Sequence, residues 1–450
     1  MFKKITNASV KMVERLLPDA FIFCVVLTVI AFVLAIVTTG QSPMQMVLHW
    51  GNGVWGLLAF SMQMALVLVL GNAFATSGLI KGFLKKIAKR AKTPLQAILL
   101  VSFVSAIACW INWGFGLIVG ALLAKELARN VEGVDYRLLI ASAYSGFVVW
   151  HNGISGSIPL QVASDLEQLK TISGGLITET IPVSQTLFSP WNLIVVWIII
   201  LTLPLLNRAM HPDKEHTVTI DPKLLIEVEQ VKYTKTKDTT PAERMENSVL
   251  LSGFITLLGV VYLANHFYTK GFDLSLNIVN LIFLILGIAF HKTPINYVHA
   301  VENAVKGAGG VILQFPFYAG IMGMMTGKSE LGVSLAGVIS EGFVAISTQR
   351  TFPLFSFWSA GIVNFFVPSG GGQWAVQGPI MMPASIQIGV DPAKTALAIA
   401  WGDAWTNMIQ PFWALPALGV AGLGARDIMG YCLMVLFYTG AIISLAFLFI

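Results

Sequence analysis

The stretch NFFVPSGGG at residues 364–372 interrupts one long apolar run, and NWG at residues 112–114 interrupts another, 252 positions earlier. A second interruption follows each of them, WTN at 405–407 and WHNG at 150–153. Inside a bilayer a broken helix is tolerated only where protein or a water-filled cavity satisfies its backbone. Duplicated breaks are the best pointer in a sequence to the binding site of a secondary transporter. We therefore look for function at these four breaks.

The composition places the chain in a membrane. Of its 450 residues, 56% are hydrophobic and 11% charged, with a mean hydropathy of +0.75. These values exclude a soluble domain and predict an all-α polytopic membrane protein. Cys24, Cys109 and Cys432 lie in apolar runs without CxxC spacing, so no disulfide framework or metal site is indicated. The net charge of +5 fits loops that face anionic lipid and gives no reason to expect nucleic acid.

Apolar runs of roughly 20 residues can cross the hydrocarbon layer as helices. Such runs predict full crossings near 20–39, 53–79, 136–160, 188–206, 249–266, 274–290, 308–326, 392–416 and 427–448. Residues 136–160 and 392–416 contain the second breaks and are expected to be broken helices. The segments 94–125 and 353–385 are interrupted near their middles, so each half is short for a crossing. We expect both to be re-entrant hairpins.

Charge placement agrees with this topology, because cytoplasmic loops carry an excess of Lys and Arg. If both hairpins enter and leave on one side, all but five of the 28 Lys and Arg residues face the cytoplasm. The five exceptions are Lys170, Lys270, Lys328, Arg350 and Lys394. This arrangement predicts a cytoplasmic N-terminus and a periplasmic C-terminus.

The two halves of the chain repeat one another in opposite orientation under this topology. Matching pairs are Ser42-Pro43 with Thr293-Pro294, Gln63 with Gln314, Asn112 with Asn364, and Asp135 with Asp391. We expect a first repeat at 1–206, a solvated cytoplasmic linker at 207–248 and a second, inverted repeat at 249–450.

The strings NFFVPSGGGQ at 364–373 and WGDAWTNMIQP at 401–411 closely resemble the short-chain fatty acid transporter family of bacteria. NWGFG at 112–116 and YSGFVVWH at 144–151 are similar to that family too. The resemblance implies a scaffold domain, a mobile transport domain with elevator-type movement, a homodimer and a bacterial inner-membrane location. It also implies ion-coupled transport of small monocarboxylates such as butyrate or acetoacetate. Another small organic anion, a dicarboxylate or an amino acid, is the alternative substrate.

A carboxylate that enters the bilayer loses its hydration and must find hydrogen-bond donors. Helix N-termini provide N–H groups and a partial positive charge of roughly half an electron, and we expect the hairpin arms after Gly114 and Gly372 to begin near the midplane. The candidates for substrate contacts are Trp113, Gly114, Ser155, Ser157, Ser369, Gly370, Gly371, Gln373 and Thr406. The alternative for these Gly and Ser residues is tight helix packing, which we favour for Gly146 and Gly402.

The coupling ion is left open between sodium and a proton. The side-chain carbonyls of Asn112, Asn364 and Asn407, with Asn152 beside them, could coordinate sodium, although asparagine also caps broken helices. The family that this sequence resembles is grouped with a wider ion-transporter superfamily. In sodium-coupled members of that superfamily, hydroxyl residues flank the hairpin asparagine. Here the flanking residues are apolar or aromatic, in the strings INW at 111–113 and VNF at 363–365, which puts a sodium site in doubt.

Proton coupling needs a titratable group inside the membrane. Asp403 is the only carboxylate well inside a predicted crossing, and His151 is the only imidazole beside a predicted break. An intramembrane ionisable residue is a functional candidate by default. A hydrogen-bonded structural role is the alternative for both. No cofactor is expected.

Tryptophans gather near the breaks, at Trp110, Trp113, Trp374, Trp401 and Trp405. Their apolar faces suit an acyl chain, and no basic residue lies at either hairpin tip, which favours a monocarboxylate over a dicarboxylate. The string GISG at 153–156 also matches the GxSG pattern of intramembrane serine proteases, with Ser155 as the nucleophile. A catalytic serine needs a histidine from another helix at the same depth, so we do not expect an enzyme. A passive channel is the third candidate function.

Overall fold

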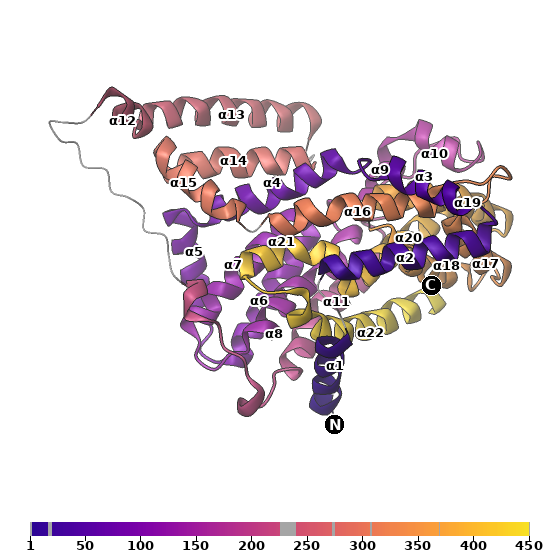
Figure 1. The fold of residues 1–450 in the computed structure, drawn as a ribbon, viewed down its shortest axis with the longest axis horizontal. Coiled ribbons are helices and arrows are strands. Elements are labelled where there is room, and N and C mark those ends of the chain that lie inside the picture. Colours follow the sequence, from indigo (N-terminus) through magenta and orange to yellow (C-terminus); the bar gives the residue numbers. More distant parts are fainter. Residues whose placement is uncertain are drawn as a thin grey trace.

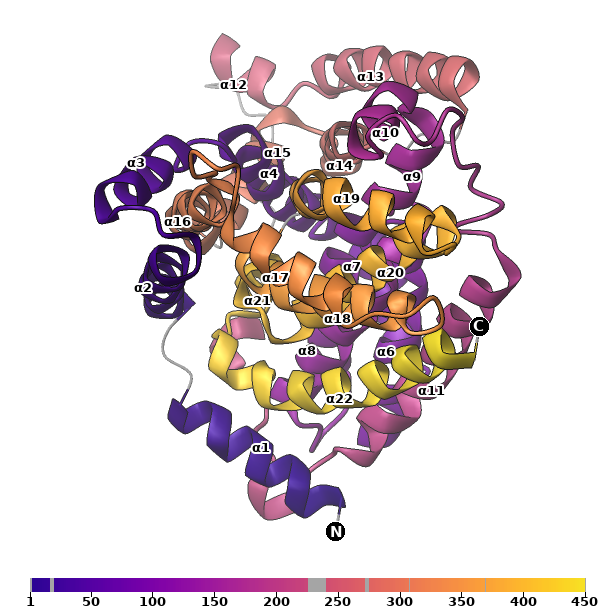
Figure 2. The ribbon, with the colours of Figure 1, turned by 90° about the vertical axis from the view of Figure 1, so that its right-hand side faces the viewer.

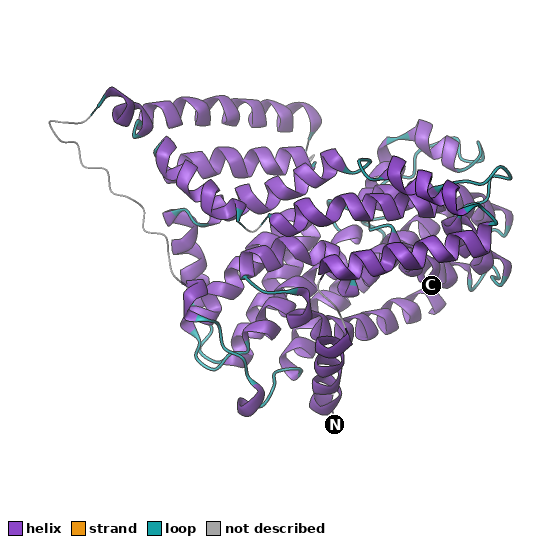
Figure 3. Cartoon of the chain, in the orientation of Figure 1, coloured by secondary structure: helices purple, strands orange, loops and turns teal. Residues whose placement is uncertain are grey.

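The computed structural model describes residues 2–16, 20–225, 240–271, 275–306, 308–368 and 370–449. Within these ranges every regular element is a helix, as the composition predicts (Figure 3). In the described part of the chain, five helices are long and apolar enough to cross a bilayer, or six if a pair bent by 81° counts as one span. The chain is a multi-pass membrane protein.

The first half of the chain contributes eleven α-helices and one 3-10 helix among the described residues. They are α1 (Phe2–Leu16), α2 (Ala20–Thr39), α3 (Pro43–Gly53), α4 (Leu58–Ala75), α5 (Gly78–Ala88), α6 (Pro94–Ile111), α7 (Trp113–Asn130), α8 (Tyr136–Ser145), η1 (Gly146–Asn152), α9 (Ser157–Ser164), α10 (Leu166–Ile172) and α11 (Pro190–Ala209). Short elements follow in the predicted linker, namely η2 (Lys214–His216), η3 (Pro222–Leu225) and α12 (Pro241–Glu246).

The second half begins with the long helix α13 (Val249–Lys270) and repeats the earlier pattern of long and short helices. Its elements are α14 (Leu276–His291), α15 (Pro294–Val305), α16 (Gly309–Thr326), α17 (Leu335–Ala345), α18 (Phe352–Phe366), α19 (Gly370–Gln387), α20 (Pro392–Thr406), η4 (Asn407–Ile409), α21 (Pro411–Ala421) and α22 (Ala425–Phe449).

Several helix starts follow directly from the sequence. Asp135 caps α8 by accepting the Leu138 N–H, and Asp391 caps α20 by accepting the Ala393 N–H. Both carboxylates satisfy N–H groups that the first helical turn leaves without a partner. The predicted crossing at 53–79 differs from the structure, because α3 ends at Gly53 and α5 turns away from α4 after Ala75. An unbroken apolar run hid these turns.

Two groups of helices divide the molecule (Figures 1 and 2). α13, α14 and α4 lie in successive layers, and α16 packs against both α2 and α3. α6, α7, α8, α11 and α22 form the opposite side, with α17 to α20 beside them. The four breaks lie in this second group, so the first group supports the site from outside.

The amphipathic helix α1 lies across the start of α22 (Figure 2). The Ser9 hydroxyl donates to the Gly430 carbonyl at 2.8 Å. Lys3 Nζ lies 2.8 Å from Asp213 Oδ1 and lowers the pKa of that exposed carboxyl. The linker is also docked, since the Val218 N–H donates to Asp135 Oδ2 at 2.8 Å. Residues 226–239 of the predicted linker lie outside the described residues.

Both interrupted segments fold back on themselves as helical hairpins. α6 and α7 turn at Asn112, and a Cβ built on Gly116 would lie 2.4 Å from the Cys109 nitrogen, so the arms touch backbone to backbone. The chain reverses between α18 and α19, and Gln373 Nε2 bridges the two arms by donating to the Ala360 carbonyl at 2.8 Å. The arms α6 and α7 have 18 residues each, about 27 Å long, so they are longer than the expected half crossings.

Candidate functional site

The two broken helices meet at their breaks. α8 leads into η1 and then α9, and α20 leads into η4 and then α21, while η1 and η4 contact each other. The Tyr144 hydroxyl at the end of α8 donates to the Asn407 carbonyl at 2.5 Å. His151, Asp403 and Asn407 have no exposed surface, so the junction is closed to solvent in this structure. Residues from both halves therefore form one buried site.

His151 and Asp403 form a hydrogen-bonded pair across this junction. His151 Nδ1 lies 2.5 Å from Asp403 Oδ2, and His151 Nε2 accepts the Ile158 N–H at 3.0 Å. A nitrogen that accepts a hydrogen bond carries no proton, so Nδ1–H must be the donor to Asp403. The Trp150 ring stacks on the imidazole with a centroid distance of 4.2 Å. The ring of His151 is thus fixed as the neutral Nδ1–H tautomer.

Asn364 joins the second hairpin to the same junction. It lies in the last turn of α18 and has no exposed surface. Its Nδ2 donates to the Asp403 carbonyl at 2.8 Å, Thr406 Oγ1 at 2.9 Å and Asn407 Oδ1 at 2.8 Å. Thr406 in turn donates to the Gly361 carbonyl at 2.9 Å. One amide therefore ties α18 to the end of α20, where the helix breaks.

The tip of the second hairpin rests on the first broken helix. A Cβ built on Gly370 would lie 2.6 Å from His151 Cε1 and 3.2 Å from Ser157 Oγ. A Cβ built on Gly371 would lie 3.2 Å from Gln161 Nε2. The backbone at position 370 can approach His151 this closely only because glycine has no side chain. Ser369, which the sequence also places at the tip, lies outside the described residues.

The tip of the first hairpin satisfies its own backbone donors. Asn112 Oδ1 accepts the Phe115 N–H at 3.0 Å, and Ser155 Oγ accepts the Trp113 N–H at 3.1 Å. Asn112 is thus an N-cap for α7, the structural role that the sequence left as an alternative. A Cβ on Gly114 would find its nearest neighbour at 3.5 Å, on Val67, so this glycine is not forced by packing.

Residues in the first turns of four helices contact side chains of η1. Trp113 begins α7, and its ring centroid is 5.8 Å from that of Trp150. α9 donates its second N–H to His151, and Gly370, the first residue of α19, lies against the same ring. Trp413 in the first turn of α21 lies 5.6 Å from Trp150. The N-terminal turns of four helices thus bring residues to one short segment, and helix N-termini are places that favour an anion.

Buried polar atoms without a hydrogen-bond partner cluster on the elements of this junction. Among the described residues they include Asn152 Oδ1 and Nδ2, Asn364 Oδ1, Asp403 Oδ1, Asn407 Nδ2, and both polar atoms of the Gln410 side chain. A buried donor or acceptor without a partner costs about 1–3 kcal/mol, so a cluster of them requires an explanation. Both donors and acceptors are present, as a carboxylate and an accompanying cation would require.

Sequence reasoning missed Gln410. It immediately precedes Pro411 and occupies the N-cap position of α21, and its side chain is fully buried. The Gln-Pro pair at the end of the WTN break could have pointed to it, because proline is favoured at the first position of a helix.

Gln373 belongs to a different polar network. Its Nε2 donates to Gln377 Oε1 at 2.8 Å as well as to the Ala360 carbonyl. Gln377 Nε2 then donates to Ser340 Oγ and Ser359 Oγ, both at 3.1 Å. These contacts lie between the arms of the second hairpin and α17. Gln373 therefore holds the hairpin together, which the sequence did not predict.

The aromatic cluster also differs from the sequence expectation. Trp113, Phe147, Trp150 and Trp413 pack around η1, with centroid distances of 5.2 to 6.3 Å. The other predicted tryptophans serve elsewhere: Trp401 donates to Asn192 Oδ1, Trp405 donates to the Leu436 carbonyl, Trp374 packs in a separate core, and Trp110 contacts Trp197. Only Trp113 of the predicted five joins the cluster.

The comparison with known proteins can now be set beside this geometry. The whole chain, residues 1–450, matches the family described as "Short chain fatty acid transporter". A protein of Escherichia coli K12 named "Putative short-chain fatty acid transporter" is 47% identical over 442 residues, covering 98% of both chains. A Haemophilus influenzae protein of the same name is 46% identical over 455 residues, covering 100% of both chains.

The chain belongs to the short-chain fatty acid transporter family. The family that the sequence motifs indicate is thereby confirmed. A weaker similarity, 28% identity over 171 residues, links 37% of the chain to 32% of an E. coli protein named "Putative basic amino acid antiporter YfcC". The crystal structure of the Alcanivorax borkumensis YdaH transporter aligns with a TM-score of 0.42 and 15% identity, covering 95% of this chain and 98% of that one. A TM-score of this size carries no argument about the site.

Membership of this family answers the hydrolase alternative. The relatives are named as transporters, so the protein is a transporter and not an enzyme, as expected. The contacts agree, since Ser155 Oγ accepts from Trp113 while both nitrogens of His151 are engaged with Asp403 and Ile158.

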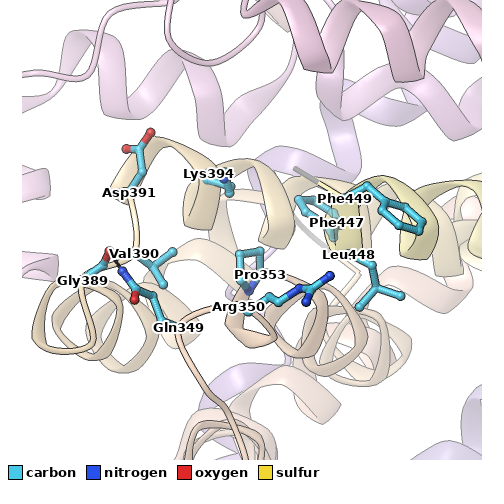
Figure 4. A pocket seen from close by; sticks show the side chains of 10 residues that line it. All are labelled: Gln349, Arg350, Pro353, Gly389, Val390, Asp391, Lys394, Phe447, Leu448 and Phe449. Atoms are coloured by element: carbon cyan, nitrogen blue, oxygen red, sulfur yellow. Dashed lines mark hydrogen bonds between the residues drawn. The ribbon is translucent and has the colours of Figure 1, made fainter.

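A separate cavity of about 480 Å³ lies at the far end of this transporter's α20 (Figure 4). Its lining residues are Gln349, Arg350, Pro353, Gly389, Val390, Asp391, Lys394, Phe447, Leu448 and Phe449. Lys394 stands at the start of α20, whereas Asp403 stands near its end. None of the predicted site residues lines this cavity.

Proposed function

We propose that this transporter is a secondary active carrier for short-chain monocarboxylates such as butyrate or acetoacetate in the bacterial inner membrane. The observation that carries the proposal is that first-turn residues of four helices contact side chains of η1, at a junction with buried donors that have no partner. Backbone dipoles can hold an anion without a basic side chain. The substrate class comes from the family, and the place of binding comes from this geometry.

The chemistry around η1 favours a single carboxylate. η1, η4, α9, α18 and α19 contain no Lys or Arg, and a second carboxylate would have no cation to meet. The cluster of Trp113, Phe147, Trp150 and Trp413 offers an apolar wall beside the dipoles. A short acyl chain attached to one carboxylate matches both features.

We further propose that the halves form an inverted repeat. α2 packs on α16 as α14 packs on α4, and α3 packs on α16 as α15 packs on α4. Exchanging each helix of the first half for its counterpart in the second half leaves these contacts unchanged, as a two-fold relationship requires. A cytoplasmic N-terminus and a periplasmic C-terminus then follow from the charge distribution.

We also propose re-entrant hairpins and an elevator-type movement, as the family resemblance implies. The layer of α4, α13, α14 and α15 would serve as the scaffold, and the hairpins with the broken helices would form the transport domain. His151, Asp403 and Asn407 have no exposed surface, so the site must open before substrate can reach them. In this proposal it opens when the second hairpin tip, where Gly370 lies against His151, moves away. In a homodimer, which the family resemblance implies, the scaffold layers of the two protomers would be held against each other.

Uptake of labelled acetoacetate into proteoliposomes tests the function. Protein-free vesicles are the blank, because short fatty acids also cross bilayers as neutral acids. We expect accumulation against a gradient, competed by propionate and butyrate but not by succinate or lysine. Equilibration without accumulation would indicate a channel. Competition by succinate or by an amino acid alone would assign the carrier to another organic anion.

A further inference from the structure

Among the described residues, the helical segments that pack on the His151–Asp403 pair contain few other ionisable groups. α9, α18 and α19 pack against η1 or α20, and their sequences contain no ionisable residue. From α8, the Tyr144 hydroxyl faces η4, and Cys109 is buried in α6. Arg137 and Lys394 stand at the starts of α8 and α20, remote from the pair, and α7, α11 and α22 carry their charged residues within six residues of a helix end.

The hydrogen bonds leave one place on the pair where a proton can bind. His151 Nε2 is occupied by the Ile158 N–H, and His151 Nδ1–H is directed at Asp403 Oδ2. Asp403 Oδ1 is buried and has no hydrogen-bond partner among the described residues. A proton added without breaking an existing bond must therefore go to Asp403 Oδ1.

We propose that the coupling ion is a proton, bound at Asp403 of the His151–Asp403 pair together with the substrate carboxylate, so that transport is electroneutral symport. This inference rests on the proposed function. One proton from the side of loading forms an O–H bond at Asp403 Oδ1, and that bond breaks again on the side of release. No bond in the substrate changes.

Repulsion between carboxylates provides the coupling. Asp403 and Asn407 lie one helical turn apart, and Asn407 Nδ2 is a buried donor without a partner, suited to a substrate carboxylate. Two ionised carboxylates at one buried site repel strongly, and a shared proton removes the repulsion. The anion therefore binds well only when Asp403 is protonated, and a protonated Asp403 gains an acceptor when the anion is present.

The charge of the moving site stays constant under this scheme. The empty site contains an ionised Asp403, and the loaded site contains a neutral Asp403 with one substrate anion. Both forms carry one negative charge through the bilayer, so a complete cycle moves no net charge and the membrane potential adds nothing to accumulation at equilibrium. An anion carried alone would be opposed by the inside-negative potential of a bacterium.

Calorimetry of the purified full-length protein measures the proton directly. Titration with butyrate in two buffers of different ionisation enthalpy gives the number of protons taken up. We expect about one proton per butyrate, and a Kd that rises about tenfold for each pH unit where Asp403 is ionised. Asp403→Asn should take up none and lose this pH dependence. Asp391→Asn, the same substitution at the other end of α20, should keep both.

Proteoliposomes test the electroneutral coupling independently of any variant. In sodium-free buffer, an inwardly directed proton gradient should drive uptake above the protein-free blank. A potential imposed with potassium and valinomycin should leave the final accumulation ratio unchanged. A requirement for sodium, a change of that ratio with the potential, or butyrate binding without proton uptake would overturn the proposal. Absence of any monocarboxylate binding or transport would instead defeat the proposed function, and this inference would fall with it.

Discussion

The two hairpins share a plan but differ in what holds their arms together and what their asparagines contact. In the first, Gly116 brings the backbones of α6 and α7 together, and Asn112 caps its own helix. In the second, Gln373 and Gln377 bridge the arms through hydrogen bonds, and Asn364 reaches out to the break in α20. The first hairpin is therefore a close-packed wall, and the second supplies side-chain chemistry to the site.

Replacing the two asparagines should show the largest difference. Asn364→Ala should reduce uptake to the protein-free blank, because buried acceptors on α20 and at its break lose the donor shared among them, at about 1–3 kcal/mol for each group left unpaired. Asn112→Ala should keep measurable uptake, because the helix cap that it removes is worth about 1 kcal/mol. Uptake in proteoliposomes is compared at equal amounts of monodisperse protein.

Full activity in Asn364→Ala would remove the second hairpin from the site. Wild-type transport by Asn112→Ala would likewise remove the first hairpin tip from direct contact with the substrate. Complete loss of uptake in a folded Asn112→Ala protein would contradict the asymmetry between the hairpins.

A methyl group added at each hairpin tip should also affect uptake differently, but the difference should be smaller than between the two asparagine variants. Gly370→Ala places a Cβ 2.6 Å from His151 Cε1, and overpacking of about 1–3 kcal/mol should lower the uptake rate about tenfold. Gly114→Ala meets its nearest neighbour at 3.5 Å and should stay within about twofold of wild type. Initial rates at several butyrate concentrations measure this. Equal losses in both variants would mean that both tips close on the substrate.

For thermal stability the order of the two hairpins should be reversed, so that an added methyl group destabilises the first hairpin more than the second. Gly116→Ala forces a methyl to 2.4 Å from the Cys109 nitrogen and should lower the thermal unfolding midpoint clearly, since overpacking costs about 1–3 kcal/mol. Gly371→Ala meets only the flexible end of Gln161 at 3.2 Å and should unfold close to wild type. An unchanged unfolding midpoint in Gly116→Ala would show that the arms of the first hairpin are not rigidly packed.

Ser155→Ala should have the smallest effect. It removes one acceptor for the Trp113 N–H, worth about 0.5–1.5 kcal/mol, and leaves the His151–Asp403 pair intact. Uptake should remain within about twofold of wild type, and neither protein should cleave a peptide. Peptide cleavage that disappears in the variant would restore the hydrolase reading.

The breaks could be read from the sequence because Asn, Gly and Pro interrupt apolar runs in a way that bilayers penalise. The pairing of His151 with Asp403 could not, since it joins residues 252 positions apart through tertiary packing. The Ile158 N–H bond and the Trp413 contacts were hidden for the same reason. Short helices such as α5 and α17 were also missed, because hydropathy windows of about 20 residues merge or overlook them.

The three native thiols, Cys24, Cys109 and Cys432, are all buried, with no exposed surface. Maleimide reagents should therefore leave the unmodified transporter unlabelled, and cysteine-free engineering is unnecessary. A single cysteine introduced at Gln161, opposite Gly371, would then report each opening of the second hairpin by its labelling rate. Substrate and pH could be varied on that background to follow the gate in real time.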